Sequence, residues 1–127
     1  MAGDLSGKKI LLVDDDRDIL MAMETALGDE GPELLTARDG NTAIDLAERE
    51  QPDLVVLDMM LPKRSGFLVL EKLRRGKDKE EMPLVVMITA NLGTRHKQYA
   101  ESLGVDEYMQ KPFRMEKLVE KIKALFE

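Results

Sequence analysis

Residues Ile10–Asp16 read ILLVDDD, four apolar residues followed at once by three carboxylates. Short apolar runs that do not alternate with polar residues are typical of strands buried on both faces of a parallel sheet. The acidic residues pose a separate problem, because two carboxylates about 4 Å apart repel by roughly 4 kcal/mol at an effective dielectric constant of about 20. The stretch therefore predicts a buried strand that ends in a negative pocket, and that pocket requires a positive partner.

Four other runs along the chain also read as strands. Leu54–Leu57 and Leu84–Ile88 are as apolar as the first run, which predicts central strands. Glu33–Ala37 and Glu107–Gln110 are more polar, as edge strands tend to be. The sequence thus predicts five strands.

Helical patterns separate these runs, with apolar residues spaced three and four apart. The polar segment Thr94–Leu103 is the weakest of them, and Gly104 follows it at a position typical of a helix C-cap. Regular alternation of strand and helix with short connections implies parallel strands, right-handed crossovers and helices on both sheet faces. The predicted class is a doubly wound α/β sandwich. The four clearest apolar faces are Ile19, Leu20, Met23 and Leu27; Ala43, Leu46 and Ala47; Phe67, Val69, Leu70 and Leu73; and Leu118, Val119, Ile122, Leu125 and Phe126.

The composition narrows the class of protein. A chain of 127 residues with 43% hydrophobic and 35% charged residues has the size and balance of one globular domain, which we expect to span residues 1–127. It contains no cysteine, so disulfides and thiol chemistry are excluded. A net charge of −6 argues against a nucleic-acid partner. With neither a signal peptide nor an apolar run of membrane-spanning length, we expect a cytoplasmic protein without a membrane partner.

The candidate chemistry follows from what ends each strand, because ligands of doubly wound sheets bind beyond the carboxyl ends of the strands. Asp14 and Asp15 end the first strand, Asp58 the third, Thr89 the fourth, and Lys111 follows the fifth. Each aspartate taken alone is equally well explained as a helix cap or a turn residue. Together they suit Mg²⁺, which binds carboxylates and often bridges phosphate. A carboxylate beside such a cation can act as a nucleophile toward phosphorus, with the hydroxyl and the ammonium binding phosphoryl oxygens.

An ordered set of motifs carries a family resemblance over nearly the whole chain. VDDD after the first strand, ARDG before the second helix, LDMMLPKRSG at the third strand, MITA at the fourth and YMQKPF at the fifth resemble the receiver domain of bacterial response regulators. The chemotaxis member of that family has the flavodoxin-like strand order 2-1-3-4-5. The resemblance therefore implies this order, with five helices.

The resemblance also implies roles for the acidic residues. Asp58 would be the phosphoacceptor and itself a ligand of Mg²⁺. Asp15 would bind Mg²⁺ directly and Asp14 through water, while Met60 would contribute its backbone carbonyl. The third acidic residue of the opening stretch, Asp16, is expected to cap or begin the first helix rather than to take part in the chemistry.

Three further positions would respond to phosphorylation. By the resemblance, Thr89 is a switch hydroxyl, Lys111 the ammonium that contacts phosphate, and Tyr108 an aromatic switch that turns inward. An ordinary half-buried aromatic residue on an edge strand is the alternative for Tyr108. The Lys111–Pro112 bond is expected to be cis by resemblance, although only about 5–6% of X–Pro bonds in folded proteins are cis.

The expected partners follow from the same resemblance. His96 is the only histidine and no glycine-rich nucleotide loop accompanies it, so the phosphodonor should be a separate sensor histidine kinase or phosphotransfer protein. The expected output surface is the face of the fourth helix, fifth strand and fifth helix, which would bind a downstream target or output domain, with a homodimer possible on phosphorylation. Such a protein is no enzyme beyond its own phosphorylation and dephosphorylation, whose rate the residue at Asn91 is expected to influence.

Two other functions compete with this hypothesis. A receiver-like interaction module that never accepts phosphate would be expected to lack Asp58, Thr89 or Lys111, and all three are present. A magnesium-dependent phosphohydrolase would carry a second aspartate two residues after the nucleophile, where Met60 stands. The sequence identifies neither the cognate kinase nor the target.

Overall fold

The computed structural model describes residues 4–63, 65–74, 83–90 and 94–127, apart from the side chains of residues 94–96. The expectation for Asn91 and the side chain of His96 lie outside this description. One five-stranded parallel sheet has the order β2-β1-β3-β4-β5, which confirms the predicted fold class and puts both polar runs at the edges. The strands are β1 Lys9–Val13, β2 Glu33–Ala37, β3 Leu54–Asp58, β4 Leu84–Thr89 and β5 Glu107–Gln110.

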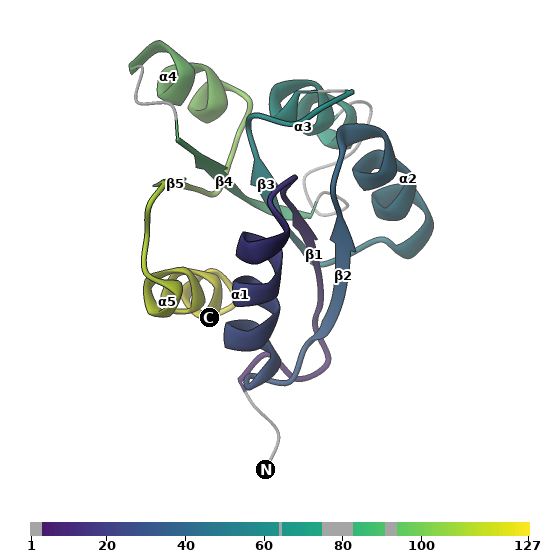
Figure 1. The fold of residues 1–127 in the computed structure, drawn as a ribbon, viewed down its shortest axis with the longest axis vertical. Helices are drawn as coiled ribbons and strands as arrows, with labels where there is room; N and C mark the ends of the chain where they lie inside the picture. Colours follow the sequence, from purple (N-terminus) through teal and green to yellow (C-terminus); the bar gives the residue numbers. More distant parts are fainter. Residues whose placement is uncertain (1–3, 64, 75–82, 91–93) are drawn as a thin grey trace.

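Helices cover both faces of the sheet (Figure 1). α1 and α5 lie on one face, and α2, α3 and α4 lie on the other. None of the helices in the described ranges is long and apolar enough to cross a membrane. The helices are α1 Arg17–Gly28, α2 Gly40–Glu50, α3 Gly66–Arg74, α4 Thr94–Ser102 and α5 Met115–Leu125.

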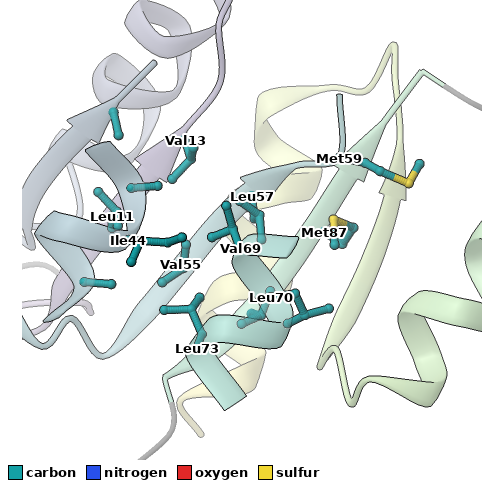
Figure 2. Packing of buried hydrophobic residues seen from close by; sticks show 14 of the residues in the cluster. Leu11, Val13, Ile44, Val55, Leu57, Met59, Val69, Leu70, Leu73 and Met87 are labelled. Atoms are coloured by element: carbon teal, nitrogen blue, oxygen red, sulfur yellow. The ribbon is translucent and has the colours of Figure 1, made fainter. Parts of the chain in front are cut away.

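The opening stretch is uniformly apolar because its strand is central. Leu11 and Val13 pack into the cluster between the sheet and α2, α3 and α4, whereas Ile10 and Leu12 pack into the cluster under α1 and α5. Figure 2 shows the first cluster, with side chains of β1, β3 and β4 packed against α2 and α3. Alternate residues of a strand point to opposite faces, so a strand covered on both sides needs apolar residues at every position.

Two helix ends agree with the prediction from the sequence, whereas the buried face of α2 differs from the predicted one. Asp16 is the N-cap of α1, as predicted. Gly104, just past α4, has φ +82° and donates its N–H to the carbonyl of Glu101 at 3.0 Å, which confirms the C-cap. On α2, Ile44 belongs to the buried face although the pattern did not include it, while Leu46 is only half buried.

Candidate functional site

Three carboxylates meet at the carboxyl edge of the sheet. Asp14 follows β1 and Asp58 ends β3, and the paired register of Val13 with Leu57 puts these two aspartates side by side. Oxygen atoms of Asp14, Asp15 and Asp58 all lie within 4.8 Å of one another. The chain leaves β1 toward β2 on one side and returns to β3 on the other, so the acidic cluster occupies the point where strand order reverses.

Lys111 supplies the positive charge that the opening stretch requires. Its Nζ lies 2.8 Å from Oδ2 of Asp14 and 3.3 Å from Oδ2 of Asp58. The Lys111 backbone N–H donates to the carbonyl of Thr89 at 2.8 Å, which ties the loop after β5 to the end of β4. The Lys111–Pro112 bond is cis, in agreement with the resemblance. The ammonium group of Lys111 therefore bridges two carboxylates that are far apart in the sequence.

Asp58 is held in a strongly perturbed environment. It is 3% exposed, its Oδ1 accepts the N–H of Met60 at 3.0 Å and its Oδ2 faces Lys111. Burial raises the pKa of Asp58 to about 6, the charge of Asp14 adds to the rise, and the Met60 N–H and Lys111 oppose it. Asp58 is therefore mostly ionised at neutral pH. Because burial disfavours its negative charge, an additional cation nearby would stabilise the ionised form.

The three consecutive aspartates have three different environments. Asp14 is fully buried, and its Oδ1 accepts the N–H of Asp16 at 2.9 Å. Asp15 is exposed at the mouth of the cluster. Oδ1 of Asp16 accepts the N–H groups of Asp18 and Ile19 at 2.9 and 3.4 Å, so Asp16 caps α1. The capping alternative therefore belongs to Asp16, and Asp14 and Asp15 are left facing the cluster.

The donor set fits Mg²⁺. Three carboxylates and one ammonium leave a net charge of −2 in the cluster, which one divalent cation balances. Among the described residues, no group donates a hydrogen bond of good geometry to the buried Oδ2 of Asp14, even though Lys111 lies close to it. Hard carboxylate oxygens are the ligands that Mg²⁺ takes, usually one or two directly with water filling the remaining positions. The residues that could hold the ion are Asp14, Asp15 and Asp58.

Thr89 and Tyr108 lie on neighbouring strands near this cluster. Thr89 is fully buried at the end of β4, one residue beyond Ile88, which pairs with Asp58. Tyr108 pairs with Met87 on β5, is half buried, and packs against the cluster beneath α2, α3 and α4. Its hydroxyl is buried without a hydrogen-bond partner among the described residues, and burial raises the pKa of Tyr108. Within the described part of the chain, no polar contact of the hydroxyl therefore fixes this aromatic side chain.

Gly66 contacts the end of β3 in a way that the sequence did not reveal. Its N–H donates to the carbonyl of Met59 at 2.8 Å, and a Cβ at this position would lie 2.4 Å from the Asp58 carbonyl oxygen. Only glycine allows this approach, because real Cβ atoms essentially never come within 3.0 Å of another heavy atom. The start of α3 therefore rests directly on the backbone of Asp58.

A second tether holds the loop that follows β3. The N–H of Gly40, at the start of α2, donates to the carbonyl of Pro62 at 3.3 Å. Lys63, whose φ is +67°, lies 3.9 Å from the Asp39 carboxylate. The ARDG motif is thus in contact with Pro62 and Lys63 of the LDMMLPKRSG motif, a contact that the sequence did not predict.

Comparisons with known proteins agree with this geometry. Residues 10–123 match the family model of the response regulator receiver domain. A CheY-like response regulator receiver domain protein from Methanospirillum hungatei is 31% identical, with a TM-score of 0.82 over 93% of this chain and 92% of that one. The chemotaxis response regulator CheY4 of Vibrio cholerae is 27% identical, with a TM-score of 0.83 over 93% and 98%. The BeF3-activated DrrB receiver domain is 29% identical, with a TM-score of 0.82 over 94% and 97%. The chain belongs to the response regulator receiver domain family of two-component signalling proteins.

Proposed function

We propose that this chain accepts a phosphoryl group on Asp58 from the phosphohistidine of a sensor histidine kinase or phosphotransfer protein, in a Mg²⁺-dependent reaction that changes its affinity for a partner. The observation that carries the proposal is the buried carboxylate of Asp58, on which Lys111, Asp14 and Asp15 converge at the edge of the sheet. Membership of the receiver family supports the same reaction class. The protein is a signalling phosphoacceptor whose only chemistry is its own phosphorylation and dephosphorylation.

In the proposed transfer, an oxygen of ionised Asp58 forms a bond to phosphorus while the bond from phosphorus to the donor's imidazole nitrogen breaks. The products are an acyl phosphate on this chain and a free histidine on the donor. Lys111 Nζ is already 3.3 Å from Asp58 Oδ2, within reach of a phosphoryl oxygen attached there. The hydroxyl of Thr89 would donate to a second phosphoryl oxygen. Both groups act by stabilising negative charge that is spread over the phosphoryl oxygens during transfer.

The residues that would hold Mg²⁺ are Asp14, Asp15 and Asp58, with the backbone carbonyl of Met60 as a further ligand. The ion, when bound, supplies positive charge against the phosphoryl oxygens. Because the ligand from Met60 would be its backbone carbonyl, we expect the identity of its exposed side chain to matter little for the metal. We place this chemistry in the cytoplasm as part of the proposal, which the absence of cysteine permits without requiring.

The proposed switch joins Thr89 to Tyr108. Phosphorylation adds close to two negative charges beside Thr89, and a charge of that size can bias a two-state equilibrium. Tyr108 is suited to move because its hydroxyl has no hydrogen bond to lose among the described residues. The output surface is the face of α4, β5 and α5, which would bind a downstream protein, an output domain or a second copy of the chain.

Labelling with acetyl phosphate tests the proposal. With Mg²⁺, wild-type protein should gain the mass of one phosphoryl group, and Asp58→Asn should gain none. Asp16→Asn is the matched control, because Asp16 belongs to the same acidic stretch but is committed to capping α1. If Asp58→Asn is still labelled, Asp58 is not the phosphoacceptor. A wild-type protein that neither labels nor accepts phosphate from a phosphohistidine donor would instead favour a receiver-like interaction module.

A further inference from the structure

α3 is attached to the rest of the protein at both of its ends. Its first residue, Gly66, rests on the backbone of Asp58. Its last residue, Arg74, donates to the carbonyl of Pro83 at 3.0 Å and to the carbonyl of Gly104 at 2.8 Å, and it pairs with Asp106 at 3.5 Å. The N-terminal end of α3 thus contacts the backbone of Asp58, and its C-terminal end is hydrogen-bonded to the segment that follows α4.

Tyr99 of α4 makes two contacts with the middle of α3. Its hydroxyl donates to Oε1 of Glu71 at 2.5 Å, and its ring meets that of Phe67 edge to face with centroids 5.0 Å apart. The neighbouring Ala100 is fully buried in the cluster beneath these helices. Figure 1 shows α4 at the periphery of this layer, next to α3. The C-terminal half of α4 is therefore held to α3 by specific side-chain contacts.

In the N-terminal half of α4, side chains are described from Lys97 onward. Lys97 and Gln98 are exposed, and the chain before α4 leads back to Thr89 at the acidic cluster. Because the chain runs from Thr89 directly into α4, we expect a displacement at Thr89 to reach the N-terminal end of this helix. The C-terminal end of α4 is followed by Gly104, whose carbonyl accepts a hydrogen bond from Arg74, so we take this end as the fixed point of any turn of the helix.

We propose that the hydrogen bond between Tyr99 and Glu71 is a latch that holds α4 against α3 while Asp58 is unphosphorylated. This latch opens when Asp58 is phosphorylated. The inference rests on the proposed function and adds to it two positioning residues outside the acidic cluster. Neither residue touches the reacting atoms. They act by setting how readily α4 moves.

Geometry makes the latch sensitive to a small motion of α4. Tyr99 lies five residues from Gly104, about 7.5 Å along a helix that rises about 1.5 Å per residue. A turn of about 10° about Gly104 moves Tyr99 by roughly 1.3 Å, enough to carry a 2.5 Å hydrogen bond beyond the usual limit of about 3.2 Å. The apolar contact of the rings is less directional and would survive a shift of that size better.

A contact made in only one of two arrangements shifts the equilibrium between them by its own free energy. Losing the Tyr99–Glu71 bond should therefore favour the arrangement that forms around a phosphoryl group. For an exposed hydrogen bond to a charged acceptor, we expect the shift to be about two- to fivefold.

Beryllofluoride with Mg²⁺, a mimic of the phosphoryl group, provides the test. Tyr99→Phe removes only the hydroxyl that donates, and Glu71→Ala removes the carboxylate that accepts. Each should raise the apparent affinity for beryllofluoride by about two- to fivefold, measured by calorimetry, and the double variant should gain no more than the stronger single variant. Glu50→Ala is the control, because Glu50 is likewise partly exposed and its ion pair with Lys9 joins α2 to β1, away from α4 (Figure 1).

Amide hydrogen exchange without beryllofluoride separates the latch from the proposed function. Both single variants should speed exchange in α4 relative to wild type and leave exchange in α1 unchanged. Unchanged affinity, or gains that simply add in the double variant, would overturn the regulatory role. A wild-type protein that binds no beryllofluoride would count against the proposed function, and unchanged exchange in α4 would then refute the latch independently.

Discussion

Replacing Asp58 by asparagine should stabilise the metal-free protein at neutral pH. In the folded chain the pKa of Asp58 is raised from an ordinary 3.8 to about 6, chiefly by burial. That difference corresponds to about 3 kcal/mol by which folding disfavours the ionised form relative to the neutral one. Asparagine resembles the neutral carboxyl in shape and hydrogen bonding, so the variant is free of this cost. The balance already includes the ion pair with Lys111 that the substitution removes.

The sign of the pH dependence follows from which state binds more protons. Between about pH 4 and pH 6 the folded protein keeps a proton on Asp58 that the unfolded chain has lost, so stability falls as pH rises through this window. Below it the carboxyl is neutral in both states, and the difference between wild type and variant should be small. Above it the variant should be more stable by up to about 3 kcal/mol.

Urea unfolding in metal-free buffer across this pH range measures the effect. At an m-value of about 2 kcal/mol per molar urea, 3 kcal/mol moves the midpoint by about 1.5 M. Adding Mg²⁺ should stabilise wild type much more than the variant, because ligand binding to the folded state alone raises stability. Asp45→Asn on the exposed face of α2 is the control, and should change stability by less than about 0.5 kcal/mol at every pH. If the variant's gain in stability over wild type is no larger at pH 7.5 than at pH 4, the reasoning about burial is refuted.

The remaining predictions concern the ligand set, the strand backbone and the core. Asp15→Ala should weaken Mg²⁺ binding sharply in titration calorimetry, whereas Asp16→Ala should leave it nearly unchanged. Asp16→Ala should instead cost about 1 kcal/mol of unfolding free energy, because the N-cap of α1 is lost. Equal losses of Mg²⁺ affinity in the two variants would mean that the wrong carboxylate has been chosen. Gly66→Ala should cost about 1–3 kcal/mol in urea unfolding and slow acetyl phosphate labelling of Asp58, because its Cβ would strike the Asp58 backbone; wild-type stability and labelling would contradict the close approach. Leu5→Ala should cost about 2–5 kcal/mol, since Leu5 is fully buried under α1 and α5, and a loss below 1 kcal/mol would show that it is not part of the core.

Much of the fold was predictable because local pattern reports burial. A strand covered on both faces must be apolar at every position, so ILLV and its counterparts on β3 and β4 were recognisable without their neighbours. The cap at Asp16 and the glycine at 104 depend on backbone groups only a few residues away, and these too were predicted. The strand order came from the family resemblance, because no local pattern specifies which strands are adjacent.

The electrostatics of the site depend on distances that the chain alone does not specify. The sequence supplied Asp14, Asp58 and Lys111 as candidates, but it could not tell that one ammonium lies within 3.3 Å of both carboxylates, although 53 residues separate it from Asp58. It could not assign different environments to three identical neighbours, because capping, burial and exposure depend on where α1 begins relative to the sheet.

The contacts of α3 show the same division. The sequence does not show that Gly66 contacts the backbone of Asp58, because this contact forms only when α3 packs onto β3. It does not show either that the hydroxyl of Tyr99 lies beside Glu71. The sequence by itself determined which segments are buried and which chemical groups are available. Only the tertiary structure decided which of those groups meet, because pKa values, ion pairs and hydrogen bonds depend on separations of a few ångströms between residues that are distant in the chain.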